Sequence, residues 1–563
     1  MFQQRTVNKE TIIKLISNKN YVEAEIQLQS LILKDPKNSD YNFFFGLILT
    51  QKRIYKEAIK FFLISVKSAD YQYDSYFNIA GCYQALFDYD SAIHYYKMSI
   101  QTNPKTYEPY LRLASCYRFF NEYEKAILNI KKSIALHPIS GSYFLLGNIF
   151  REMSNFKDAR INFEIAIRLD QNFNNAHIGL ANLDIDEGNF ENAQNKLGEI
   201  LIKKNLSKPI KIAAEISLGI IYQSKGEYKD AEKIYIHILE EDPKNGDANY
   251  NLAICYLNMQ NYKMGWIYHE KRTDHIIFGI LRSRLQKFSK PLWSNIRPKK
   301  NLLIWGEQGI GDMILYSQFI QVIKDQFTNL TIAVDNKLLI FFRKIFDDLQ
   351  VIDIDNMNNF QKYEYHLPMG SLGFHFQKYI NKNDLKIKQN YKQDNKLLPM
   401  KKDKYRIGIS WSSANKIFGH KKSLVLALLK DIFLYPNLEF INLQFKADFN
   451  EIKNLEKKIE KKIFIEHHID CFNDIDGVAQ LINTCDYIIS VSNSNAHIAG
   501  KMGIKTFLIL PKYDGKLWYW GENEDNGILW YPSIKPIRQL NDGDWNSCIT
   551  QLKNEIEKTI LQQ

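Results

Sequence analysis

Residues 89–92 read Tyr-Asp-Ser-Ala, and an aromatic residue three positions before an alanine recurs along the first half of the chain. The alanines are separated by 34, 34, 34, 33, 34 and 38 residues: Ala24, Ala58, Ala92, Ala126, Ala159, Ala193 and Ala231. Twelve residues before each of the last six stands another small residue: Gly46, Ala80, Ala114, Gly147, Ala181 and Gly219. A period near 34 with small residues at two fixed phases predicts stacked helix pairs.

The aromatic residue and the alanine lie on one helix face, and the small residues let paired helices approach closely. Prolines at 36, 104, 138 and 243 stand where the second helix of a pair should stop. The pattern resembles the tetratricopeptide repeat in about seven copies, and we assign residues 1–272 to the array. This resemblance implies a superhelix whose concave face binds a protein or peptide. The 38-residue step predicts a longer loop near residues 206–212.

Composition indicates a folded protein, with 45% hydrophobic and 13% aromatic residues and a net charge of +11. The basic residues are spread out and no aromatic platform is interleaved with them, so we expect solvated helix faces and no nucleic-acid partner. The first residues lack the apolar stretch of a signal peptide, and no apolar run approaches the ~20 residues that cross a bilayer. The cysteines show no disulfide framework or metal spacing, so we expect a cytoplasmic protein without a membrane segment.

The second half alternates strand and helix patterns. An apolar stretch at 302–305 precedes Gly-Glu-Gln-Gly-Ile-Gly-Asp at 306–312 and a helical stretch at 313–324, which is the opening of a nucleotide-type βα unit. Further strands are predicted at 330–334, 350–354, 405–411, 438–443, 486–491 and 505–510. We therefore expect an α + α/β multidomain protein in which two Rossmann-like domains face each other across a cleft.

The expected boundaries place a junction at 273–300, a first Rossmann-like domain at 301–395 and a second at 404–535, followed by a helical tail at 536–563. The polar stretch 382–404 is the predicted hinge between the two domains.

Several short motifs occur in a fixed order in this half: Glu307–Asp312, Ser410-Trp411-Ser412, Lys422-Ser423, Leu443-Gln444 and Ser492–Gly500. Their order resembles that of bacterial tetratricopeptide-repeat proteins whose C-terminal domain is related to lipopolysaccharide heptosyltransferases, a group with the GT-B fold. The aromatic motifs around Pro291, Trp518, Trp530 and Trp545 fit the same resemblance. It implies a glycosyltransferase that uses a nucleotide-sugar co-substrate, without a metal or other cofactor.

The turn after the first strand is the expected catalytic and acceptor-side element. It contributes Glu307, Gln308, Gly309, Gly311 and Asp312, and in related enzymes the matching aspartate is the proposed base. The dipole of the following helix favours the ionised carboxylate. The alternative is that Asp312 only caps the helix.

The expected donor site lies in the second domain. The stretch 492–497 joins a strand to a helix, where N–H groups and side chains can hold a phosphate; it consists of Ser492, Asn493, Ser494, Asn495, Ala496 and His497. The alternative is a capped helix with a packed histidine. Lys421 or Lys422 is expected to neutralise the diphosphate, and Gln444 to touch the nucleoside. Ser412 belongs to the same edge, and Trp411 either stacks on the ligand or packs.

The sequence is compatible with three alternative functions. The leading one is transfer of a sugar to a protein held by the repeats, and the second is transfer to a cell-envelope glycan. The third is a non-enzymatic scaffold, because related enzymes commonly carry Asp-Thr-Ser where this chain has Ser492-Asn493-Ser494. No Asp-x-Asp pair is placed to hold a metal between the domains. The donor sugar, the acceptor and the oligomeric state are not predicted.

Overall fold

The computed structural model describes residues 9–275, 278, 279, 281, 284, 285, 288–294, 300–355, 362–379, 391, 404–415, 419–521 and 527–561. These divide into two compact units, Met1–Ala214 and Glu215–Gln563, and each unit is treated by itself. Of the predicted hinge 382–404, all but residues 391 and 404 lie outside the described residues, as does part of the junction 273–300.

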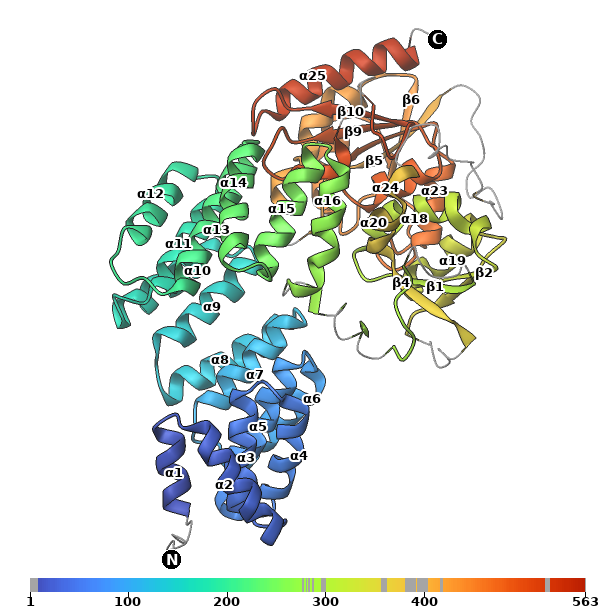
Figure 1. Ribbon diagram of the computed structural model, residues 1–563. Helices are drawn as coiled ribbons and strands as arrows, with labels where there is room; N and C mark the ends of the chain where they lie inside the picture. The colour runs from blue at the N-terminus through green and yellow to red at the C-terminus, as the bar shows by residue number, and fades with distance from the viewer. Residues whose placement is uncertain are drawn as a thin grey trace, which may run out of the picture. The chain divides into compact units, whose positions relative to one another are not determined.

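The first unit is built of helices, each packed on the next along the chain (Figure 1, blue to green). Its helices are α1 Lys9–Ser17, α2 Tyr21–Lys34, α3 Ser39–Gln51, α4 Tyr55–Ser65, α5 Ala69–Ala85, α6 Tyr89–Thr102, α7 Glu108–Phe119, α8 Tyr123–Leu136, α9 Ser140–Glu152, α10 Phe156–Leu169, α11 Asn174–Asp186 and α12 Phe190–Leu201. The repeat alanines open the second helix of each pair and are fully buried, as the period predicts.

The small residue on the first helix of a pair faces a large side chain on the second. A Cβ added at Gly46 would stand 2.7 Å from the ring of Phe62, which is too close for any residue larger than glycine. Phe163 fills the same role between Gly147 and Gly179, since a Cβ at either position would lie within 2.8 Å of its ring. Close packing of this kind leaves no room for a larger residue at these glycines.

The step of 38 residues mainly lengthens a helix. α13, Lys208–Ser224, has 17 residues whereas α11 has 13, so the first helix of the seventh pair begins a turn earlier relative to its small residue, Gly219. The connection 202–207 is also longer than its counterpart 170–173. The prediction of a longer loop was therefore incomplete, because an added helical turn takes up four residues without breaking the backbone hydrogen bonds.

The second unit begins with the last repeats and continues into a parallel sheet. Its helical part comprises the end of α13, α14 Tyr228–Glu241, α15 Gly246–Asn258, α16 Tyr262–His269 and η1 Glu270–Asp274. The first sheet has the order β3-β2-β1-β4, with β1 Asn301–Trp305, β2 Asn329–Val334, β3 Gln350–Asp353 and β4 Tyr365–Pro368. The segments that connect or follow these strands are α18 Ile310–Ile323, η3 Lys324–Gln326, α19 Asn336–Ile345, η5 Met369–Ser371, α20 Leu372–Phe376 and η6 Gln377–Tyr379.

The second sheet is parallel with the order β10-β9-β8-β5-β6-β7, which is the strand order of doubly wound nucleotide-binding sheets. Its strands are β5 Tyr405–Ser410, β6 Leu438–Asn442, β7 Ile463–Phe464, β8 Tyr487–Val491, β9 Thr506–Leu510 and β10 Ile534–Arg538. Its helices are η7 His420–Lys422, η8 Leu426–Leu429, α21 Lys430–Phe433, α22 Phe449–Ile459, α23 Ile475–Asn483, α24 Ser494–Lys501, η9 Trp518–Trp520, α25 Trp545–Ile556 and η10 Glu557–Leu561. β10 spans the boundary expected between 535 and 536, so the tail contributes to this sheet.

One hydrophobic core joins the last repeat to both sheets. It includes Trp266 of α16, Ile304 of β1 and Ile488 of β8, all of which are fully buried. A Cβ at Gly373 of α20 would stand 2.4 Å from the Trp266 ring, and the ring lies 5.3 Å from that of Trp518. The last repeat therefore packs as part of the α/β region.

Candidate active site

The predicted site residues follow the carboxyl ends of strands at the point where each sheet reverses its strand order. In the first sheet this point lies between β1 and β4, and in the second between β5 and β8. Ligands of open α/β sheets bind in the crevice at such points. A Cβ at Gly311, in the turn after β1, would stand 2.7 Å from Cδ2 of His497 on α24, so the two turns touch.

Asp312 lies in the first turn of α18, whose N-cap is Gly309. The N–H of Gly309 donates to the Asp312 carboxylate, an interaction typical of a capping box. Burial raises the pKa of Asp312 to about 6, with the charge of Lys422 lowering this pKa and that of Glu307 raising it. The dipole alone favoured a low pKa, but burial outweighs it. The carboxylate remains mostly ionised at neutral pH and is basic enough to take up a proton.

Lys422 is the cation of this site. Its side chain is buried on η7, and burial lowers its pKa to about 8, while the charge of Asp312 raises it. Within the described chain its ammonium makes no recorded hydrogen bond or salt bridge. Lys421 points elsewhere, because its ammonium lies 2.8 Å from Oδ2 of Asp514. Of the two lysines, Lys422 is therefore the one available to a phosphate.

His497 is a packed, neutral residue. It is 3% exposed, its Nδ1 lies 2.9 Å from the hydroxyl of Tyr531, and its ring centroid is 4.6 Å from that of Trp520. Burial and the charge of Lys422 lower its pKa to about 3. An imidazole in this state carries no charge for a phosphate, so the arrangement matches the packed-histidine alternative.

Most side chains of the stretch 492–497 bond within the protein. Asn493 caps α24 by accepting from the N–H groups of Asn495 and Ala496, and it donates to Oγ of Ser410 at 2.7 Å. Ser492 accepts from Nε1 of Trp520 at 2.9 Å. Ala496 is fully buried, and Nδ2 of Asn495 donates to the carbonyl of Leu443 at 2.8 Å. These bonds join the turns after β5, β6 and β8.

Ser494 differs from the rest of this stretch. It is the first residue of α24 and is partly exposed, and its hydroxyl has no hydrogen-bond partner among the residues that the structure describes. Ser494 is therefore the side chain of this turn that is open to a ligand.

Gln444 and Trp411 also serve the scaffold. Oε1 of Gln444 accepts from the N–H groups of Trp411 at 3.0 Å and Ser412 at 2.8 Å, and Nε2 donates to the carbonyl of Phe445. The Gln444 side chain is buried and shapes the turn after β5. Trp411 is 3% exposed and donates through Nε1 to Glu451, which shows that it packs.

The turn after β1 is held by a residue that the sequence analysis did not identify. Nη2 of Arg272, in η1, donates to Oε1 of Glu307 at 3.0 Å, and the N–H of Gly370 donates to the same oxygen at 2.9 Å. Gln308 contributes a longer contact to this oxygen, 3.4 Å from its Nε2. The pKa of Glu307 is raised by burial, and the charge of Arg272 acts against that rise.

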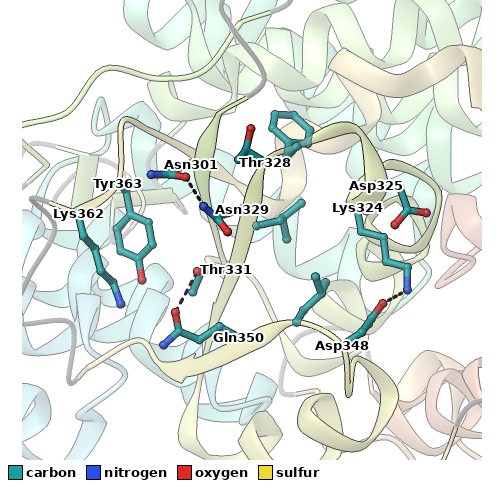
Figure 2. A pocket seen from close by; sticks show the side chains of 13 residues that line it. Asn301, Lys324, Asp325, Thr328, Asn329, Thr331, Asp348, Gln350, Lys362 and Tyr363 are labelled. Atoms are coloured by element: carbon teal, nitrogen blue, oxygen red, sulfur yellow. Dashed lines mark hydrogen bonds and ion pairs between the residues drawn. The ribbon is translucent and has the colours of Figure 1, made fainter.

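A separate cavity of about 490 Å³ lies at the opposite end of the first sheet (Figure 2). Its lining includes Asn301, Asn329 and Gln350, the first residues of β1, β2 and β3. Because Asp312 follows the carboxyl end of β1, this cavity does not belong to the candidate site. Among the described residues, no group of three or more His, Cys, Asp or Glu side chains is placed to hold a metal ion.

Comparisons with known proteins support the repeats. Tetratricopeptide-repeat families match residues 73–106, which cover most of α5 and all of α6, and residues 222–263, which cover α14 and α15. The chain therefore carries tetratricopeptide repeats, which form scaffolds for protein–protein interaction. Every helix in the described part of the chain is too short or too polar to cross a membrane.

The chain is also similar to the protein FlbA of Caulobacter vibrioides, with 23% identity over 312 residues that cover 50% of each chain. It thus spans about half the length of this curated relative. A tetratricopeptide repeat protein from Parabacteroides merdae is 15% identical, covering 44% of this chain and 96% of that one with a TM-score of 0.40. Yeast Tom70 is 15% identical, covering 48% and 60%, with a TM-score of 0.37.

Proposed function

We propose that the chain is a metal-independent glycosyltransferase that moves a sugar from a nucleotide-sugar to an acceptor. The observation that carries this proposal is that Asp312 and Lys422, each within range of the other's charge, lie where the two sheets present their carboxyl ends. One group has a pKa of about 6 and the other of about 8, so near neutral pH a base and a cation stand in one site.

Each group has a step in the transfer. Asp312 accepts the proton of an acceptor hydroxyl while the acceptor oxygen forms a bond to the anomeric carbon of the sugar. The bond between that carbon and the phosphate oxygen breaks, and the nucleoside diphosphate leaves with the electron pair. Lys422 and the N–H groups at the start of α24 stabilise the charge that develops on the leaving phosphate.

The tetratricopeptide repeats favour a protein as the acceptor, since such arrays bind polypeptides along an extended surface. A cell-envelope glycan is the second acceptor class, and in that case the repeats recruit a protein partner. The repeats therefore supply recognition in both versions, and the chemistry belongs to the α/β region.

A scaffold without activity is the alternative function, and one observation favours it. The turn at 492–494 carries no carboxylate, and the side chains of Ser492 and Asn493 are engaged within the protein. A donor sugar would then lack an acidic partner there.

Thermal unfolding in the presence of nucleotide-sugars separates these functions. A ligand at 100 times its Kd stabilises the folded state by about 2.7 kcal/mol. UDP-, GDP- and ADP-linked sugars are tested on the unsubstituted chain and on the Lys422→Met variant. If the protein is a glycosyltransferase, one class of nucleotide-sugar should raise the melting temperature of the unsubstituted chain. The same nucleotide-sugar should raise the melting temperature of the Lys422→Met variant by a smaller amount. No shift with any class supports the scaffold.

A further inference from the structure

Arg272 connects the end of the repeats to the turn that carries Asp312. It is 1% exposed, and its two terminal nitrogens serve two carboxylates. Nη2 donates to Glu307 at 3.0 Å and to Oγ of Ser371 at 2.9 Å, and Nη1 donates to Oε2 of Glu270 at 3.2 Å. Ser371 in turn donates to Oε1 of Glu270 at 2.8 Å. The cluster joins η1 to the turns after β1 and β4.

The side chains of Arg272, Glu307 and Ser371 are buried, that of Glu270 is partly exposed, and the positive and negative charges of the cluster are unequal in number. One guanidinium stands between two carboxylates, and the Glu307 side chain is fully buried. Oε2 of Glu307 and Nε of Arg272 have no hydrogen-bond partner among the described residues. Buried ion pairs add little net stability, because the cost of desolvation offsets the attraction, whereas removal of one partner is strongly destabilising. A contribution to the geometry of the turn therefore accounts for the pair better than a contribution to stability.

Glu307 transmits the position of Arg272 to the site in two ways. Its Oε1 accepts from the N–H of Gly370 at 2.9 Å, which ties the turn after β1 to the turn after β4. Glu307 also precedes Asp312 in the same turn, and its charge raises the pKa of the Asp312 carboxyl. The charge of Glu307 depends on Arg272, since a buried carboxylate without a cation beside it favours the protonated form.

We propose that Arg272 is a positioning residue for glycosyl transfer, acting through Glu307 on the turn that holds Asp312. The proposal rests on the function proposed above. According to this proposal, the end of the repeat array supplies a residue that positions the catalytic turn. The fully buried Trp266, one helical segment earlier, anchors this end in the shared core.

The first test uses a reporter that needs no donor. In the full chain carrying Asp312→Cys, the rate of alkylation by iodoacetamide at residue 312 is followed against pH by peptide mass spectrometry, which gives the thiol pKa. A nearby negative charge raises a thiol pKa, so Glu307→Gln should lower it. Arg272→Met should lower it in the same direction, because the unpaired Glu307 becomes neutral. Arg272→Lys keeps a cation beside Glu307 and should leave the thiol pKa unchanged.

Arg272→Met alone leaves the Glu307 carboxylate buried without its cation and can fail to fold. The double variant Arg272→Met/Glu307→Gln removes both charges of the pair and is therefore expected to be less destabilised. It should melt at a higher temperature than Arg272→Met and still show the lowered thiol pKa. The matched control is Arg406→Met/Glu439→Gln, a second ion pair with a buried arginine, in which Nε lies 2.7 Å from Oε1 at the amino ends of β5 and β6. This control should leave the thiol pKa at 312 unchanged. A thiol pKa that is the same in Arg272→Met and in the chain with Arg272 intact overturns the proposal.

Turnover provides the second test, in chains with Asp312 intact. The double variant should lower kcat by about 100-fold, the usual effect of a misplaced catalytic group, with little change in the KM for the donor. Arg272→Lys should recover part of that loss. A double variant with wild-type kcat contradicts the proposal. An unmodified chain that turns over no nucleotide-sugar contradicts the proposed function instead, and the alkylation result then decides on Arg272 alone.

Discussion

Gly311 lies directly against the ring of His497, so that a Cβ at position 311 would stand 2.7 Å from Cδ2 and 3.0 Å from Nε2 of the imidazole. The two residues belong to α18 and α24, which start at the carboxyl ends of different sheets. His497 is fixed in turn by Tyr531 and by Trp520. The contact brings the turn with Asp312 next to the turn with Ser494, and it leaves no space for a side chain between them.

Gly311→Ala should therefore push the two turns apart. We expect a loss of turnover and a lower melting temperature, because neither the buried imidazole nor the helix backbone has room to give way. The matched control is Gly198→Ala in α12, where a Cβ would meet nothing within 4 Å. That change should stabilise its helix by about 1 kcal/mol, since alanine is the better helix former. Equal effects of the two substitutions on turnover would contradict the contact.

The pH dependence of kcat/KM should be bell-shaped. Asp312, with a pKa of about 6, acts as a base when deprotonated, so activity rises as the pH passes 6. Lys422, with a pKa of about 8, stabilises the leaving phosphate when protonated, so activity falls above 8. Lys422→Arg should remove the fall, because arginine stays protonated there.

Lys421→Met is the control for this profile. Lys421 pairs with Asp514, and its loss should leave both limbs in place. If the fall in activity at high pH shifted in Lys421→Met and stayed unchanged in Lys422→Arg, Lys421 and not Lys422 would be the residue that contacts the phosphate.

The repeats should depend on the large residue that faces the glycines. Phe163 is fully buried between Gly147 and Gly179, so Phe163→Ala should cost about 3–5 kcal/mol and speed hydrogen exchange in α9 to α12. Leu128 is 57% exposed, and Leu128→Ala should have little effect. Similar exchange in the two variants would contradict the packing described for the pairs.

A chain that begins near residue 285 should not fold like one that begins at 215. The shorter chain lacks Trp266 and Arg272, which the core and the turn after β1 require. We expect the fragment 215–563 to show a cooperative thermal transition and the fragment 285–563 to show none, as followed by circular dichroism. On this expectation, the α/β region does not fold alone when the chain is cut within 273–300. Identical transitions in both fragments would contradict this expectation.

The repeats could be predicted from the sequence because their signal is periodic and local. Seven strands of the α/β region were also predicted, since most of them are apolar on both faces, as buried parallel strands are. Three strands were not predicted. His366 and Pro368 interrupt β4, Lys535, Pro536 and Arg538 interrupt β10, and β7 has only two residues, Ile463–Phe464. Edge positions in a sheet tolerate such residues.

The sequence predicted where the candidate site lies, but it predicted the roles of only some of its side chains. Polar side chains before a helix suggest a ligand, but in the structure Asn493 and Gln444 use their bonds to join loops. A single sequence does not separate these two uses, since the same donors and acceptors serve both. Arg272 escaped prediction because its partner Glu307 lies 35 residues away and no period links them.

The most direct measurement is the release of nucleoside diphosphate by the full chain and by Asp312→Asn, supplied with the nucleotide-sugar that raises its melting temperature. We expect steady release by the unsubstituted chain at pH 7, with water in the place of the acceptor hydroxyl, so that the sugar is released as the free sugar. For Asp312→Asn we expect a rate that is lower by a factor of about 100 or more, with donor binding retained, because a positioned base contributes at least that much. Equal rates for the two chains would contradict the role of Asp312 and with it the proposed mechanism.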